Sequence, residues 1–154
     1  MIDEDTYSMR ALALLYMASR RHEVTNAQMK KEIKQIIEYC GSRGLFIPFD
    51  FIELNEDDLY SKPFNYLMGK ITDLEYVQAH SSELTYKINE DIVKNLSNPN
   101  SIYLREMSNK DLSILCDAIQ LFDEKPLNWL KNNGLEDPIT IWRDRSDRDK
   151  SQNI

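Results

Sequence analysis

The residue types that most often bind metals or act as nucleophiles are scarce in this chain and stand apart in the sequence. It has two histidines, His22 and His80, and two cysteines, Cys40 and Cys116, none of them in a CxxC or HxxxH pattern. A metal site needs several such side chains at fixed spacing, and a nucleophile needs a neighbouring base. We expect the histidines to be solvated or capping residues and the cysteines to be buried free thiols.

Residues 53–58 hold the densest run of acidic side chains, which could in principle bind a divalent metal. The run lacks the alternating ligand spacing and the interior glycine of a calcium loop. Acidic residues also favour the N-terminus of a helix, so a solvated helix start is the preferred interpretation. The four glycines form no phosphate-binding loop after a strand. We predict no catalytic residue, cofactor or metal, and expect a protein that is not an enzyme.

Two clusters of basic side chains are the best candidates for contact with nucleic acid or with an acidic partner. The first lies at the end of the first predicted helix and contains Arg20 and Arg21, and the second contains Lys30, Lys31 and Lys34. The three lysines lie around one predicted helix, away from its apolar stripe. The alternative interpretation is a solvated helix surface without a partner.

The overall charge argues against DNA as the main partner. The formal net charge is -7, whereas proteins that depend on phosphate contacts are usually basic. Residues 1–45 carry seven basic and six acidic side chains, and residues 46–105 carry five basic and ten acidic ones. The best candidate for a recognition helix has Lys62 and Lys70 and no arginine, although arginine is the commonest reader of guanine. We do not expect autonomous sequence-specific DNA binding.

Residues 63–88 predict a helix followed by a β-hairpin. Phe64, Leu67, Met68, Ile71 and Leu74 recur at helical spacing. The alternating segments 75–79 and 84–88 then predict two strands, joined by a polar turn at residues 80–83. Asn89 is expected to cap a further helix. This order predicts an α+β, mostly helical, winged-helix-like domain whose hairpin forms the wing.

The flanking segments predict further helices. The first runs over about residues 5–21, and a second follows the capping box of Thr25 and Gln28 and ends at Gly41 and Gly44. Residues 45–52 predict an extended segment that Pro48 limits to an edge or a bulge. Additional C-terminal helices are expected after Ser108 and from Pro126.

The C-terminal part of the chain carries both tryptophans, Trp129 and Trp142. Tryptophan is enriched at the centres of interfaces, so these two residues are candidate partner-binding residues, with burial in the domain's own core as the alternative. Residues 143–154 alternate arginine and aspartate without apolar periodicity, which predicts a solvated tail. We therefore expect one domain over residues 1–142 and a polar charged tail over residues 143–154.

The order of elements resembles a known family. A helix containing Arg10–Met17 (RALALLYM) is followed by Pro63–Val77 (PFNYLMGKITDLEYV), by a strand ending in Leu84–Ile88 (LTYKI), and by a helix. This layout, over roughly residues 8–122, resembles the small middle-component subunits of ABC-three-component defence systems, which include the Lamassu-type systems. It also resembles, less closely, the Panacea-type antitoxin domain, which usually has a Gly-Pro pair before its third helix where this chain has Lys62-Pro63.

The resemblance implies a non-catalytic accessory subunit in bacterial antiphage defence. Such a subunit bridges an SMC- or Rad50-like ATPase and an effector, and touches DNA, if at all, within the complex. Two alternatives stay open: a winged-helix transcriptional regulator that binds DNA, and an antitoxin that masks a toxin. The acidic N-terminus and the absence of an apolar run of roughly 20 residues predict a cytoplasmic protein that has no membrane partner.

Overall fold

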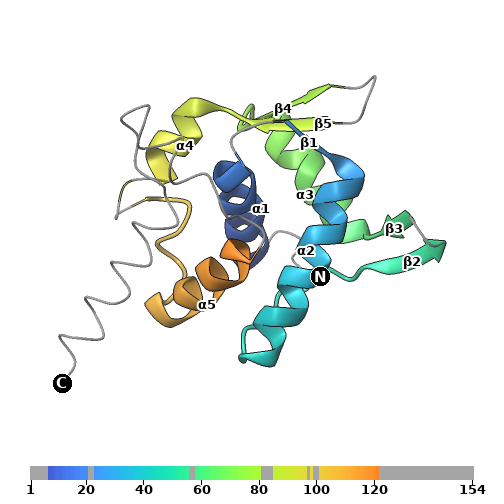
Figure 1. Cartoon of the computed structure of the whole chain (residues 1–154). Coiled ribbons are helices and arrows are strands. Elements are labelled where there is room, and N and C mark those ends of the chain that lie inside the picture. The colour runs from blue at the N-terminus through green and yellow to red at the C-terminus, as the bar shows by residue number, and fades with distance from the viewer. Residues whose placement is uncertain are drawn as a thin grey trace.

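A computed structural model of the chain describes residues 7–20, 23–55, 58–80, 85–96, 98 and 101–121. The protein has an α+β, mostly helical fold, as the sequence predicted (Figure 1). The elements in chain order are α1 (Tyr7–Arg20), β1 (Val24–Thr25), α2 (Asn26–Ser42), β2 (Ile52–Asn55), β3 (Asp58–Tyr60), α3 (Lys62–Asp73), β4 (Val77–His80), β5 (Thr85–Ile88), α4 (Glu90–Leu96) and α5 (Asn109–Gln120).

Helix α1 forms the centre of the hydrophobic core. Every residue from Ala11 to Ser19 is buried, because the sequence is apolar around the whole circumference of the helix. In space α1 contacts both β5 and α5, so it lies between the sheet and the C-terminal helix of the described region (Figure 1). The core is therefore built around α1, and the other helices cover it with a single apolar face each.

The N-terminus of helix α2 lies where the sequence predicts it. The C-terminus differs slightly from the prediction. The Thr25 hydroxyl accepts a hydrogen bond from the Gln28 N–H at 3.1 Å, as the capping box requires. Gly41 lies inside the last turn instead of ending the helix. Gly44 adopts a φ of 90° just beyond it, and the Leu45 N–H then donates to the Cys40 carbonyl at 2.9 Å.

A second hairpin, which the sequence analysis did not predict, lies between α2 and α3. Strands β2 and β3 pair antiparallel, with Ile52 opposite Tyr60 and Glu53 opposite Leu59. The predicted helix start within residues 53–58 is wrong, because β2 extends to Asn55 and Asp58 begins β3; Glu56 and Asp57 fall outside the described residues. Residues 43–61 thus separate α2 from α3, whereas a helix-turn-helix joins its two helices by about 3–4 residues.

The segment that leads into this hairpin is extended, as predicted, but only its last residue, Ile52, belongs to a strand. Leu45, Ile47 and Phe49 are buried. The Phe49 ring packs against Phe64 of α3 with the centroids 5.8 Å apart. The segment is therefore held by aromatic packing in place of a strand ladder.

Helix α3 and the β4–β5 hairpin confirm the predicted order of elements. The Ser61 hydroxyl caps α3 by accepting from the Phe64 N–H at 3.2 Å. The predicted apolar face is buried, with one exception: Leu74 follows the helix and is 46% exposed. Strands β4 and β5 then pair antiparallel from Val77–Ile88 to His80–Thr85, and β1 joins the outer side of β5 to give the order β1-β5-β4.

Strand β4 starts two residues later than predicted because of a turn at Glu75. Glu75 has a φ of 62°, in the left-handed region, and its carbonyl accepts a hydrogen bond from the Asn89 side-chain amide. The Asn89 N–H also donates to the Tyr76 carbonyl at 3.0 Å. Asn89 precedes α4 as expected, but its side chain fastens the turn at Glu75.

Helix α5 begins at the predicted cap, where the Ser108 hydroxyl accepts from the Asp111 N–H at 3.1 Å. Cys116 on this helix and Cys40 on α2 are buried free thiols, as expected. The helix predicted from Pro126 and the tail over residues 143–154 lie outside the described residues. No helix in the described ranges is both long and apolar enough to span a bilayer.

Candidate functional site

The predicted basic residues fall on two different helices and do not form one surface. Arg20 ends α1, whereas Lys30, Lys31 and Lys34 lie on α2. Arg21 lies outside the described residues. The basic side chains on each helix make different contacts within the protein, and these contacts determine which of them face solvent.

Arg20 belongs to a cluster that joins α1 to α2. Its guanidinium contacts Oε1 of Glu32 at 2.5 Å, and the two side chains are only 15% and 16% exposed. The Tyr16 hydroxyl donates to the other oxygen of the same carboxylate, and the Arg20 guanidinium lies 5.5 Å from the Tyr16 ring centroid. The carboxylate of Glu32 is thus shared by a cation and a phenol, which holds the two helices together.

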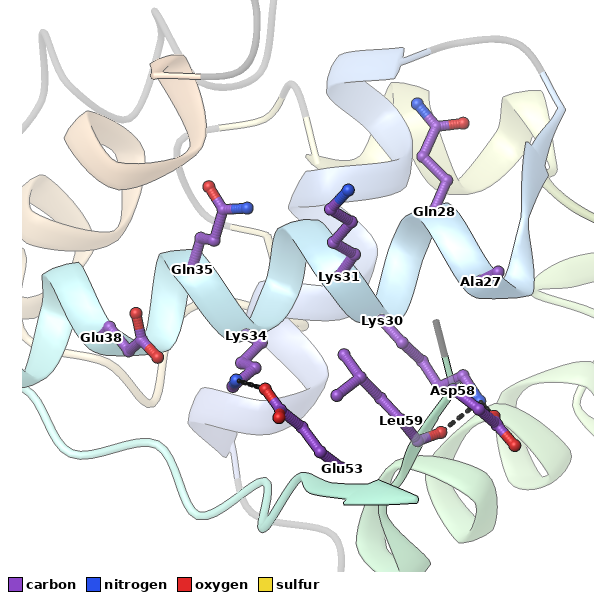
Figure 2. Close-up of a pocket in the computed structure, with 10 residues that line it drawn as sticks. All are labelled: Ala27, Gln28, Lys30, Lys31, Lys34, Gln35, Glu38, Glu53, Asp58 and Leu59. Carbon is purple, nitrogen blue, oxygen red and sulfur yellow. Dashed lines mark hydrogen bonds and ion pairs between the residues drawn. The ribbon is translucent and has the colours of Figure 1, made fainter. Parts of the chain in front are cut away.

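Lys30 and Lys34 face a groove between α2 and the β2–β3 hairpin (Figure 2). The groove has a volume of about 550 Å³. Lys30 Nζ donates to the Leu59 carbonyl at 2.6 Å and lies 4.0 Å from Asp58. Lys34 Nζ contacts Oε1 of Glu53 at 2.9 Å. Both lysines therefore fasten the hairpin to α2.

The pKa values of the second pair reflect this contact. The hydrogen bond and the positive charge of Lys34 lower the pKa of the Glu53 carboxyl, and Glu53 in turn raises the pKa of Lys34. Both groups are thus charged at neutral pH, and Lys34 is neutralised locally by its partner. Such a lysine has less positive field to offer a phosphate than an unpaired one.

Lys31 differs from its two neighbours. It is exposed and also lines the groove, but Figure 2 shows its side chain leaving α2 in another direction than Lys30 and Lys34, away from strand β2. The three lysines, which the sequence places around one helix, are therefore divided between an attachment site and an open polar face.

The β2–β3 hairpin carries exposed apolar side chains that were not predicted from the sequence. Ile52 is 52% exposed, Leu54 is 61% exposed, and Tyr60 is 42% exposed. Ile52 and Tyr60 stand directly opposite each other across the two strands. The sequence signal for this strand was the alternation of apolar and polar residues in Ile52-Glu53-Leu54. The acidic run of residues 53–58, which overlaps it, favoured a helix start instead.

Helix α3, the candidate recognition helix, exposes a mixed polar face. Lys62, Asn65, Tyr66, Gly69 and Asp73 are exposed, whereas Phe64, Leu67, Met68 and Ile71 are buried. Among these exposed residues Lys62 is a cation and Asp73 an anion. The face is therefore nearly neutral.

The residues best suited to chemistry stay apart in the described ranges. No group of three or more His, Cys, Asp or Glu side chains converges there. Burial raises the pKa of the Cys40 thiol to about 11, which disfavours the nucleophilic thiolate at neutral pH. His22 and the His80 side chain fall outside what the structure describes, and so do Trp129 and Trp142, the candidate partner-binding residues.

Comparisons of the chain with protein-family models, with curated proteins and with solved structures give no match.

Proposed function

We propose that this protein is a winged-helix-like, non-catalytic accessory subunit that acts by holding protein partners together. In the system that the sequence resembles, these partners are an SMC- or Rad50-like ATPase and an effector of bacterial antiphage defence. The order of α3 followed by the antiparallel β4–β5 hairpin supports the winged-helix-like interpretation. The proposed mechanism is scaffolding, in which partner binding shifts the effector between inhibited and released states.

The observation that carries this proposal is that Lys30 and Lys34 are bound to the β2–β3 hairpin and do not form an open basic surface. The two cations attach the β2–β3 hairpin to α2, and the attached hairpin exposes Ile52, Leu54 and Tyr60. A helix face that would otherwise attract phosphate therefore supports an element with apolar side chains. Exposed apolar patches are typical of protein-binding surfaces.

A DNA-binding regulator is the second candidate function. The β4–β5 hairpin packs beside α3, and the exposed face of α3 is available for a groove. The near-neutral charge of that face and the net charge of -7 make it the weaker candidate. The two functions differ in their prediction for isolated duplex DNA.

Co-purification tests the accessory role directly. The affinity-tagged full-length protein, expressed with its genomic neighbours, should retain an ATPase and an effector in stoichiometric amounts after size-exclusion chromatography. Leu67→Asp, which places a charge in the core beneath α3, is the unfolded control. Lys94→Ala, at an exposed position on α4, should behave as the unsubstituted protein. Elution of the tagged protein alone would contradict the proposal.

A further inference from the structure

One side of the β2–β3 hairpin faces α2, and the opposite side exposes a pair of apolar side chains. Glu53 and Leu59, paired across the strands, line the groove against α2, where Glu53 meets Lys34 (Figure 2). Ile52 and Tyr60, the next pair, are 52% and 42% exposed. A one-sided antiparallel sheet normally packs its apolar face on the core. Here the side that faces α2 holds Glu53 and the half-buried Leu59, and the opposite side leaves Ile52 and Tyr60 exposed.

This orientation leaves the hairpin with weak support. Its attachments to α2 include a lysine–carbonyl hydrogen bond of 2.6 Å and an ion pair of 2.9 Å. Exposed ion pairs stabilise little, and a two-stranded hairpin is marginally stable in water without a packed face. Burial of Ile52, Leu54 and Tyr60 by a partner would add apolar contact to that which Leu59 makes on the inner side.

The charge of the same segment selects the kind of partner. Residues 50–58 contain five acidic side chains and no basic one, and Lys30 and Lys34 offset only part of this charge. Asp50 is exposed, and the Glu53 and Asp58 side chains, which meet Lys34 and Lys30 in the groove, are still 68% and 53% exposed. An anionic membrane or DNA would be repelled. A second copy would bring two acidic rims together, since a twofold contact pairs identical surfaces.

We propose that the outer face of the hairpin, formed by the Ile52–Tyr60 pair with the exposed Leu54 at the bulge next to it, is the docking site for a basic amphipathic segment of a protein partner. The apolar side chains of that segment pack on the three residues, and its lysines or arginines meet the acidic rim. This proposal rests on the proposed function in one respect, namely that the partner is a protein.

The first experiment asks whether the face is open in the full-length protein. Ile52→Cys is treated with a fluorescent maleimide under native conditions. The natural thiols Cys40 and Cys116 are buried, so the unsubstituted protein is the blank. Rapid labelling of the new thiol, close to that of Ile102→Cys at an exposed position between α4 and α5, is expected. Slow labelling would show that the chain covers the face itself, and would overturn the proposal.

The second experiment uses a defined probe. A fluorescent helical peptide of leucine and lysine is titrated with the protein at about 150 mM salt, where long-range attraction is screened, and anisotropy is recorded. The double variant Ile52→Ser/Tyr60→Ser should weaken binding by about tenfold or more, and Ile102→Ser should not. Asp50→Asn should weaken binding more than Asp73→Asn, which removes the same charge from α3.

Besides slow labelling, three further results would overturn the proposal. In one, the variant Ile52→Ser/Tyr60→Ser binds the leucine–lysine peptide as tightly as the unsubstituted protein does. In another, a leucine–glutamate peptide binds as tightly as the leucine–lysine peptide. The third is a dimer in sedimentation analysis that Ile52→Ser/Tyr60→Ser dissociates, which would assign the face to a second copy. These readouts need no genomic neighbour, so they stand even if co-purification finds no ATPase or effector. Conversely, a complex that forms with the double variant would keep the accessory role and reject this face.

Discussion

The hydroxyl of Tyr16 on α1 donates a hydrogen bond to Oε2 of Glu32 on α2, although Tyr16 has no exposed surface. The same carboxylate also pairs with Arg20. Burial raises the pKa of Tyr16 above its ordinary value, the bond to Glu32 and its negative charge raise it further, and Arg20 opposes them in part. The neutral phenol is therefore needed for the contact between the two helices.

Stability should fall at alkaline pH in a way that depends on Tyr16. Because its pKa is raised in the folded state, the unfolded chain loses the proton first, and the stabilising contribution is lost as pH rises above about 10. Burial also raises the pKa of Tyr86, so Tyr16→Phe should remove only part of this loss. At neutral pH the same variant should cost on the order of 1.5–3 kcal/mol, the usual range for a hydrogen bond to a charged group.

Urea denaturation followed by circular dichroism, at several pH values between about 8 and 11, measures both effects. Tyr7→Phe, at a tyrosine that is 61% exposed, is the matched control. It should reproduce the unsubstituted profile. Parallel profiles for Tyr16→Phe and the unsubstituted protein would show that the buried phenol has no part in the alkaline loss.

The core face of α3 should be the most sensitive part of the predicted helix–hairpin unit. Leu67 is fully buried, and Tyr66, its neighbour in sequence, is 50% exposed. Leu67→Ala should lower the free energy of unfolding by about 2–5 kcal/mol, through lost burial and the cavity left behind. Tyr66→Ala should change it by less than about 0.5 kcal/mol. Similar losses in the two variants, measured by urea denaturation, would contradict the assignment of this face to the core.

The helix–hairpin unit could be predicted because its signals are local. Ser61 and Pro63 start α3, the buried residues recur at helical spacing, and alternation then marks the strands. The caps Thr25 and Ser108 are equally local. Each of these features depends on residues within a few positions of one another.

The β2–β3 hairpin could not be predicted on the same grounds. Its strands have four and three residues, too few for a clear alternation, and the acids between them are equally typical of a helix start. The roles of Lys30 and Lys34 depend on contacts 29 and 19 residues away in the chain. Tertiary structure decides whether a lysine is paired or open. The sequence therefore predicted the lysines of the candidate site but not their attachment to the hairpin.

The isolated protein should bind duplex DNA weakly or not at all at physiological salt. Its net charge is -7, Lys30 and Lys34 are occupied by the hairpin, and α3 carries no arginine. Anisotropy titration of a labelled duplex is the measurement, with Lys31→Glu as a test of the one open lysine of this trio. Sequence-specific binding tighter than about 100 nM, within the range of specific binders, would make the regulator the better proposal.

A subunit that bridges two partners needs two separate surfaces, and Trp129 and Trp142 are the candidate partner-binding residues that the sequence offers for the other one. They lie outside the described residues, so their role is still a prediction from the sequence. Tryptophan combines a large contact area with few rotamers and is common at interface centres. If the hairpin face binds one partner, Trp129→Ala or Trp142→Ala should release the other and leave the first in place.

Thermal melting alongside pull-down separates this role from a structural one. Loss of one partner with an unchanged melting temperature is expected if the indoles form an interface. Ile52→Ser/Tyr60→Ser is the matched variant, because it should release the opposite partner from the same complex. If either tryptophan is part of the core, its replacement should cost about 3–5 kcal/mol and lower the melting temperature strongly, while both partners still bind at low temperature. That result would place the second surface elsewhere on the protein.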